Sequence, residues 1–97
     1  MELYAIRRRD GWTTAEELGE SAARSAAEGD KPGSGIRWIR SYVVTEVDGG
    51  LGTVCIYEAE SPEAIRTHAH RVGMPADEIS PVADTVIVRQ DPVTVAS

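Results

Sequence analysis

The sequence predicts one α+β domain in which strands and helices follow each other in the order β-α-β-β-α-β. The chain has 97 residues, and its 41% hydrophobic and 27% charged residues are typical of a single globular domain spanning residues 1–97. Two segments with helix caps and helical spacing lie between segments rich in β-branched and aromatic residues. This alternation predicts helices packed against a sheet.

The first third of the chain predicts a strand followed by a helix. Residues 3–8 form a short apolar segment that suits a strand, and the pair Asp10-Gly11 ends it. Thr13 and Thr14 each precede a glutamate by three residues, which is the spacing of a capping box. Helical spacing then continues to about Gly29 through Ala15, Leu18, Ala22 and Ala26.

The middle of the chain predicts a β-hairpin. Residues 36–47 and 53–59 alternate and are rich in β-branched and aromatic residues, and the glycine-rich segment 48–52 separates them. We therefore expect two antiparallel strands joined by a five-residue turn.

A second helix and a last strand complete the pattern. Ser61 as N-cap and Pro62 at the first helical position begin the helix, and Gly73 ends it. Residues 79–89 contain five β-branched apolar residues and predict the last strand, while the segment from Asp91 onward is a terminal tail. The order matches the ferredoxin-like fold, a four-stranded antiparallel sheet with two helices on one face.

The predicted strand 36–47 carries apolar residues on both faces of the sheet. Trp38 and Tyr42 lie on one side, and Ile39 and Val43 lie on the other. Because two helices cover only one face, the second face needs another partner. We expect a homodimer through this uncovered face, a dimeric α+β barrel, with a ligand surface as the competing use.

Charge and composition exclude several classes of protein. The net charge of -6 and the pI near 4.8 have the wrong sign for nucleic-acid binding, and the run Arg7-Arg8-Arg9 is interpreted as a solvated strand end. The sequence shows no apolar run long enough to span a membrane and no signal peptide, which predicts a cytoplasmic protein without a membrane partner. Cys55 is the only cysteine, so no intramolecular disulfide and no zinc-finger spacing occurs.

His68 and His70 form the only histidine pair in the sequence. Residues two apart on a helix point in nearly opposite directions, so the two imidazoles do not bind one metal ion together. His68 shares the apolar stripe of the second helix and is expected to face the sheet, whereas His70 points outward. His68 is then either a hydrogen-bonded core histidine or a metal ligand or acid/base.

A hairpin register that pairs Val44 with Cys55 would also pair Ser41 with Glu58. In that register Glu58 approaches His68 from beneath the second helix. An imidazole and a carboxylate in one pocket would supply two ligands of a divalent-metal site, act as a general acid/base pair, or form a structural hydrogen bond.

The same register gathers aromatic and polar residues on the opposite face of the hairpin. Cys55 there is either a soft metal ligand or nucleophile, with a cation nearby, or a small packed hydrophobe. The aromatic rings either line a ligand cavity or fill a dimer core. The predicted ligand-binding residues on this face are Trp38, Arg40, Tyr42 and Tyr57.

Three parts of the sequence together resemble a known family. They are IRWIRSYV at 36–43, CIYEA at 55–59, and EAIRTHA at 63–69 followed by GMPADEI at 73–79. The chain resembles the small nickel-binding-protein family, also described as a domain of unknown function, from residue 36 to residue 82 and in the first strand. The resemblance implies a ferredoxin-like homodimer, nickel binding in at least one member, and no established reaction.

The resemblance and the residues together give three hypotheses of function, two of which involve a chemical site and the third of which is an interaction or stress protein with no chemistry in a pocket. The first is binding of a divalent transition metal, Ni²⁺, through His68 with help from Glu58 or Cys55, and with no organic cofactor. The second, based on fold analogy, is a cofactor-free cyclase, isomerase or oxygenase that acts on a small molecule. Its catalytic residues would be His68, Glu58 and Tyr42.

Overall fold

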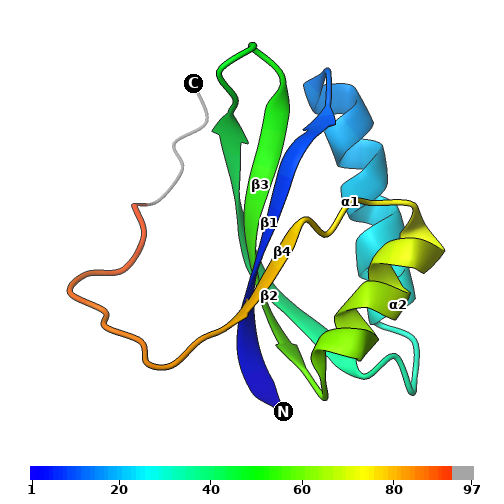
Figure 1. Ribbon diagram of the computed structural model, residues 1–97, viewed down its shortest axis with the longest axis vertical. Coiled ribbons are helices and arrows are strands. Elements are labelled where there is room, and N and C mark those ends of the chain that lie inside the picture. The colour runs from blue at the N-terminus through cyan, green and yellow to red at the C-terminus, as the bar shows by residue number, and fades with distance from the viewer. Residues whose placement is uncertain (93–97) are drawn as a thin grey trace.

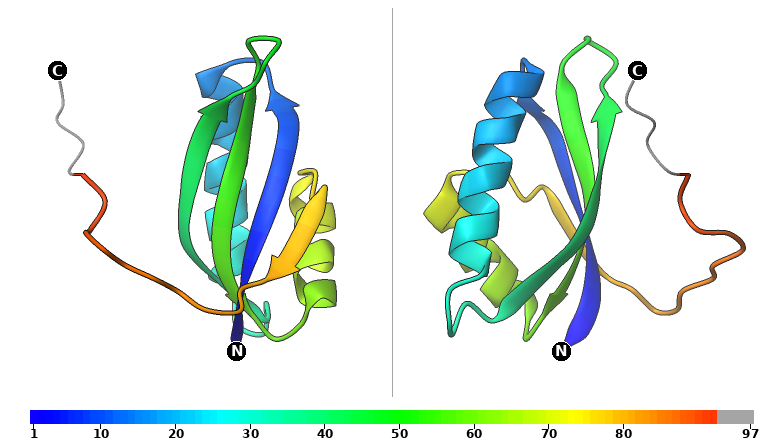
Figure 2. Two further views of the ribbon diagram at one scale, coloured as in Figure 1. Left: turned by 60° about the vertical axis from the view of Figure 1, so that its left-hand side comes forward. Right: turned by 180° about the vertical axis from the view of Figure 1, so that it is seen from behind.

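The computed structural model describes residues 1–92, and these form the predicted βαββαβ arrangement (Figure 1). Helices α1 and α2 lie on the same face of one sheet, as the view from behind also shows (Figure 2). The ferredoxin-like fold is therefore confirmed. Its elements are β1 (Glu2–Trp12), α1 (Ala15–Gly29), β2 (Ile36–Thr45), β3 (Leu51–Ala59), α2 (Pro62–Val72) and β4 (Glu78–Pro81).

The four strands are ordered β2-β3-β1-β4, and every neighbouring pair is antiparallel. The two central strands, β1 and β3, turn alternate residues toward the helices. The hydrophobic core lies between the helices and this face, which we call the inner face, and the other side is the outer face. The core is made by Tyr4, Ile6, Ile36, Cys55, Tyr57, Ala59 and Ile65.

The helices begin and end where local signals place them. Of the two candidate caps of α1, Thr14 is the one used, and its hydroxyl accepts from the backbone N–H of Glu17 at 3.2 Å. Ser61 caps α2 by accepting from the N–H of Ala64 at 3.1 Å. Gly73 ends α2 in the left-handed conformation, with φ of 69°, where a side chain is disfavoured. Within residues 1–92, no helix combines the length and the apolarity that a membrane crossing needs.

The predicted register between β2 and β3 is wrong. Ser41 pairs with Cys55, Tyr42 pairs with Val54, and the ladder closes with Thr45 opposite Leu51. The reason is a β-bulge between Trp38 and Arg40, together with a β2 strand that ends before the predicted Val47. An extra residue in one strand reverses which face the following side chains take.

The last strand is much shorter than the predicted segment 79–89. Strand β4 ends at Pro81, and the backbone N–H of Val82 donates to the carbonyl of Leu3 at 3.0 Å. The following residues, 82–92, leave β4 without regular secondary structure and are here called the C-terminal arm (Figure 2). Most of the predicted tail from Asp91 onward lies outside the described residues.

Candidate functional site

His68 lies on the inner side of α2 and is only 3% exposed. Its Nε2 atom is 3.0 Å from the hydroxyl of Ser25, which α1 contributes from the facing helix. Its Nδ1 atom has no hydrogen-bond partner within the described part of the chain. His70, two residues later, is exposed, so the two histidines occupy different environments as their spacing predicts.

The hydroxyl of Ser25 joins His68 to Tyr57. It lies 3.0 Å from the Tyr57 hydroxyl, and Tyr57 is 1% exposed on β3. The Tyr57 ring is also the centre of the aromatic packing, with its centroid 6.0 Å from both the His68 ring and the Trp38 ring. The result is a buried polar chain from α2 through α1 to the sheet.

Burial changes the proton affinity of both titratable members of this chain. Desolvation lowers the pKa of His68, and the nearby positive charge of Arg8 lowers it further. Desolvation raises the pKa of Tyr57. At neutral pH the site therefore holds a neutral imidazole and a neutral phenol.

Arg8 is the residue that sequence reasoning missed. It is completely buried on the inner face of β1, whereas the arginine triplet predicted a solvated strand end. Its Nη1 atom donates to Cys55 Sγ at 3.1 Å, and its Cζ atom lies 5.7 Å from the centre of the Tyr57 ring. Strand alternation could have revealed it, because every second residue of a strand points to the same face and Arg8 therefore shares the inner face with Tyr4 and Ile6.

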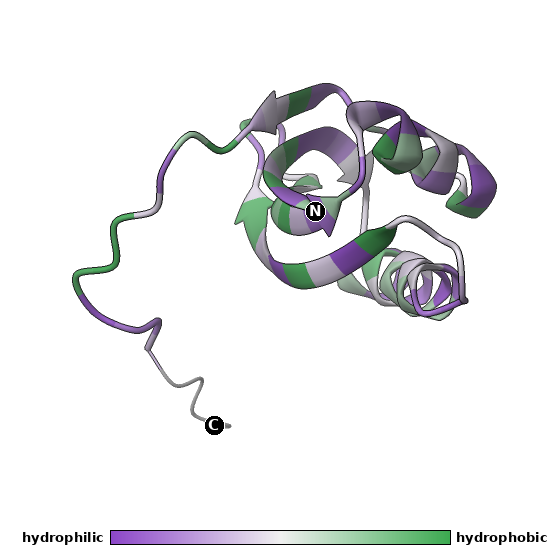
Figure 3. Ribbon diagram, turned by 90° about the horizontal axis from the view of Figure 1, so that it is seen from below, coloured by the Kyte–Doolittle hydropathy of each residue, from purple (hydrophilic) through white to green (hydrophobic). Residues whose placement is uncertain are grey.

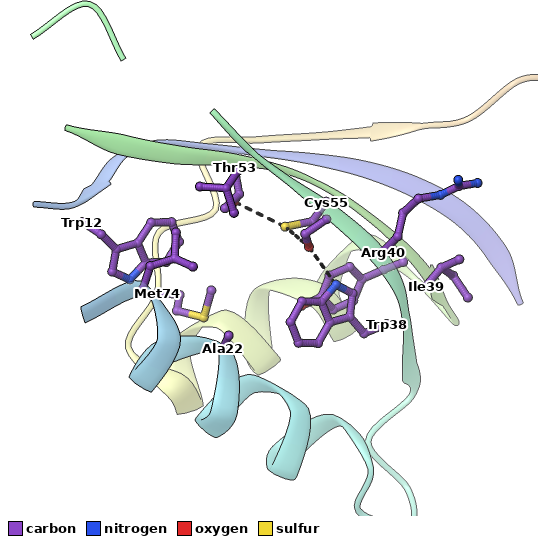
Figure 4. Close-up of a pocket in the computed structure, with 12 residues that line it drawn as sticks. Trp12, Ala22, Trp38, Ile39, Arg40, Thr53, Cys55 and Met74 are labelled. Atoms are coloured by element: carbon purple, nitrogen blue, oxygen red, sulfur yellow. Dashed lines mark hydrogen bonds between the residues drawn. The ribbon is translucent and has the colours of Figure 1, made fainter. Parts of the chain in front are cut away.

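A cavity of about 490 Å³ opens beside Cys55, between α1 and the inner face of the hairpin (Figure 4). The hydroxyl of Ser41 donates to Cys55 Sγ at 3.0 Å, and the indole N–H of Trp38 donates to Ser41 at 2.7 Å. The cavity wall is mostly apolar, with contributions from Trp12, Leu18, Ala22, Ile39, Val43, Tyr57 and Met74.

The predicted pair of His68 and Glu58 does not form. Glu58 lies on the outer face and makes an ion pair of 2.9 Å with Arg37, because β3 alternates and its neighbours Tyr57 and Ala59 point inward. The prediction had turned Ile56 and Glu58 inward, whereas in the structure Cys55, Tyr57 and Ala59 are the buried residues of β3.

The predicted ligand-binding group is divided between the two faces. Trp38 and Tyr57 border the inner cavity with Cys55. Tyr42 lies on the outer side, where its hydroxyl donates to Asp91 of the C-terminal arm at 2.8 Å. The guanidinium of Arg40 turns to the same Asp91 at 3.2 Å and points away from Cys55, although Arg40 borders the cavity mouth (Figure 4).

The predicted metal ligands are also separated. Residues 1–92 contain no group of three or more His, Cys, Asp or Glu side chains placed to hold one ion. Cys55 faces a buried cation, Glu58 faces Arg37 outside, and His68 contacts hydroxyls. A complete nickel centre is thus not preformed within residues 1–92 of the chain.

Comparison with known proteins identifies the family. The model of the family described as nickel responsive protein SCO4226-like matches residues 4–82. The chain belongs to this family. The crystal structure of SCO4226 from Streptomyces coelicolor A3(2) has a TM-score of 0.70 at 20% identity, covering 87% of this chain and 99% of that one, which supports the shared fold. No curated protein matches the chain.

Proposed function

We propose that this protein binds nickel(II) and that His68 supplies the imidazole ligand. The observation that carries the proposal is the free Nδ1 atom of a buried imidazole whose pKa is lowered, so that the nitrogen lone pair is available at neutral pH. Membership in a nickel-responsive family supports this choice of metal.

The other two predicted ligands take different places in the proposal. Cys55 is held by the guanidinium of Arg8, and a divalent cation at the sulfur would meet that positive charge. Glu58 is on the far side of the sheet from His68. We therefore propose His68 as the principal protein ligand, and each of the other two residues is tested by its own variant.

Isothermal titration of the metal-free, tag-free protein with Ni²⁺, compared with Zn²⁺ and Co²⁺, tests the proposal. We expect micromolar binding that is lost in His68→Gln, whose side-chain amide still reaches Ser25 but offers no aromatic nitrogen. The matched control is His70→Gln on the exposed side of the same helix. Equal losses in both variants, or no binding by the wild-type protein, would refute the assignment, and Cys55→Ser and Glu58→Gln should retain binding.

We also propose a homodimer that forms through the outer face. Ile39 and Tyr42 are exposed there, and with Leu3, Ile56 and the C-terminal arm they line a groove of about 550 Å³. The arm adds three exposed apolar residues, Val86, Ile87 and Val88. Figure 3 shows hydrophobic segments in green along the arm. Apolar surface of this extent is typical of an interface.

Light scattering coupled to size exclusion tests the dimer. We expect a dimer for the wild-type protein at micromolar concentration and a monomer for Ile56→Asp, which places a charge in the groove. The control is Val47→Asp at the exposed tip of the hairpin, which should remain dimeric. A monomeric wild-type protein would contradict the proposal.

Binding of a small organic molecule is the second candidate function, and the 490 Å³ cavity favours it. The cavity has an apolar aromatic wall and a few polar groups near Cys55, as ligand pockets commonly have. The predicted catalytic trio does not assemble, since Glu58 and Tyr42 lie on the outer side, so binding without a stated reaction is proposed. Crystallographic soaking with small aromatic compounds should show density beside Trp38, and an empty cavity in every soak would exclude it.

A further inference from the structure

Arg8 is a buried cation without an ion-pair partner in the described part of the chain. Its guanidinium is completely buried, and no carboxylate within residues 1–92 lies at ion-pair distance from it. Two of its nitrogens, Nε and Nη2, have no hydrogen-bond partner in the same part of the structure. Buried cations are normally paired with an anion, and buried donors are normally hydrogen-bonded. Arg8 can therefore donate hydrogen bonds to an additional acceptor that the reduced protein does not supply within residues 1–92.

Within residues 1–92, the guanidinium donates a hydrogen bond to the sulfur of Cys55 and lies over the ring of Tyr57. Arg8 Nη1 and the hydroxyl of Ser41 both donate to Sγ, at 3.1 Å and 3.0 Å, and the thiol donates to the Thr53 hydroxyl at 3.3 Å. The sulfur also borders the 490 Å³ cavity, which is large enough to admit a molecule the size of a peroxide. The sulfur that borders the cavity is therefore bonded to a buried guanidinium, two of whose nitrogens have no partner within residues 1–92.

We propose that Cys55 is a site of reversible oxidation by hydroperoxides and that Arg8 stabilises the oxidised form. The sulfur lone pair attacks one oxygen of hydrogen peroxide, the O–O bond breaks, and the departing hydroxide takes the thiol proton to form water. The sulfur loses two electrons and the peroxide gains them. The product is a sulfenic acid, Cys–SOH, whose new oxygen is bonded to the sulfur that Arg8 contacts.

Oxidation of Cys55 adds a hydrogen-bond acceptor next to Arg8. The sulfenic oxygen is a stronger acceptor than a thiol sulfur, and it adds an acceptor next to a guanidinium that has unpartnered nitrogens within residues 1–92. No second cysteine exists in the sequence, so an intramolecular disulfide does not consume the sulfenic acid. The oxidised state should consequently persist until an external thiol reduces it.

The experiment treats the full-length protein with hydrogen peroxide and follows it by intact mass spectrometry, with dimedone as the trap for sulfenic acid. We expect one added oxygen, one dimedone adduct at Cys55, and full reversal by dithiothreitol. Arg8→Lys keeps the positive charge but removes the planar guanidinium with its several N–H donors. The lifetime of the sulfenic acid should then fall about tenfold, which corresponds to the loss of about one hydrogen bond to a charged group. Arg9→Lys, at the exposed neighbouring position, is the matched control.

Folding of Arg8→Lys is checked by circular dichroism. Should that variant not fold, the wild-type chain unfolded in denaturant provides the comparison, and its sulfenic acid should also decay about tenfold faster than in the folded protein. The proposal is overturned if native Cys55 does not react, if it passes directly to sulfinic acid, or if its sulfenic acid is no longer-lived than in the unfolded chain.

Discussion

Ser25 is a small residue whose loss should be unexpectedly costly. Its hydroxyl is the shared partner of His68 Nε2 and the Tyr57 hydroxyl, both at 3.0 Å and all three buried. Ser25→Ala removes one oxygen and leaves two buried polar groups without that partner. At about 1–3 kcal/mol for each such group, the free energy of unfolding should fall by about 3 kcal/mol.

Tyr57→Phe is the informative comparison, because it removes one partner and leaves the other hydrogen bond intact. Ser25 still bonds to His68 in this variant, so the expected loss is about 1 kcal/mol. Urea unfolding at pH 7.5, followed by circular dichroism and linear extrapolation, measures both values. Ser80→Ala, at an exposed site on β4, is the control for the serine-to-alanine change. A smaller loss for Ser25→Ala than for Tyr57→Phe would refute the bridging role.

Two further predictions concern pH and backbone packing. Because burial lowers the pKa of His68, the unfolded chain binds a proton more readily than the native protein does. The free energy of unfolding should therefore decline as the pH falls below about 6.5. Urea titrations at pH 5 to 7 measure this decline, which should be smaller in His68→Gln. Gly52→Ala should destabilise the protein by about 2 kcal/mol or more, because the added Cβ would lie 2.5 Å from the carbonyl oxygen of Arg8. Gly19→Ala is the control, since the space around this position in α1 is open, and it should stabilise the protein by about 0.5–1 kcal/mol in the same assay.

The fold could be predicted because its signals are local. Thr14, Ser61 and Gly73 each fix a helix end through a bond or a backbone conformation that the neighbouring sequence determines. Alternating apolar residues then identify the strands, and the βαββαβ order leaves few ways to arrange them. The exception is the segment after Pro81, whose β-branched residues favour a strand although no neighbouring strand pairs with them.

The site could be predicted only in part because it depends on register. The helical stripe correctly turned His68 inward, since that inference needs only the period of one helix. The pairing with Glu58 required the correct face of β3 to be chosen, and both faces of that strand carry apolar residues, while the bulge after Trp38 separately changes the faces of Ser41 and Tyr42 without a recognisable sequence signal. Arg8 was hidden for a different reason, because three consecutive arginines suggest solvent although strand alternation turns only the middle one inward.

Arg8 also determines how the nickel and oxidation proposals relate to each other. A divalent cation at Cys55 Sγ would have to approach a guanidinium 3.1 Å from the sulfur, whereas a sulfenic oxygen gains from the same charge. If His68 is the ligand and Cys55 is not, protein oxidised at Cys55 should retain its nickel affinity within about twofold, a free-energy change well under 1.4 kcal/mol. Peroxide-treated Cys55→Ser is the control for damage elsewhere. A loss of affinity confined to the oxidised wild-type protein would make Cys55 a nickel ligand and would require Arg8 to move when the metal binds.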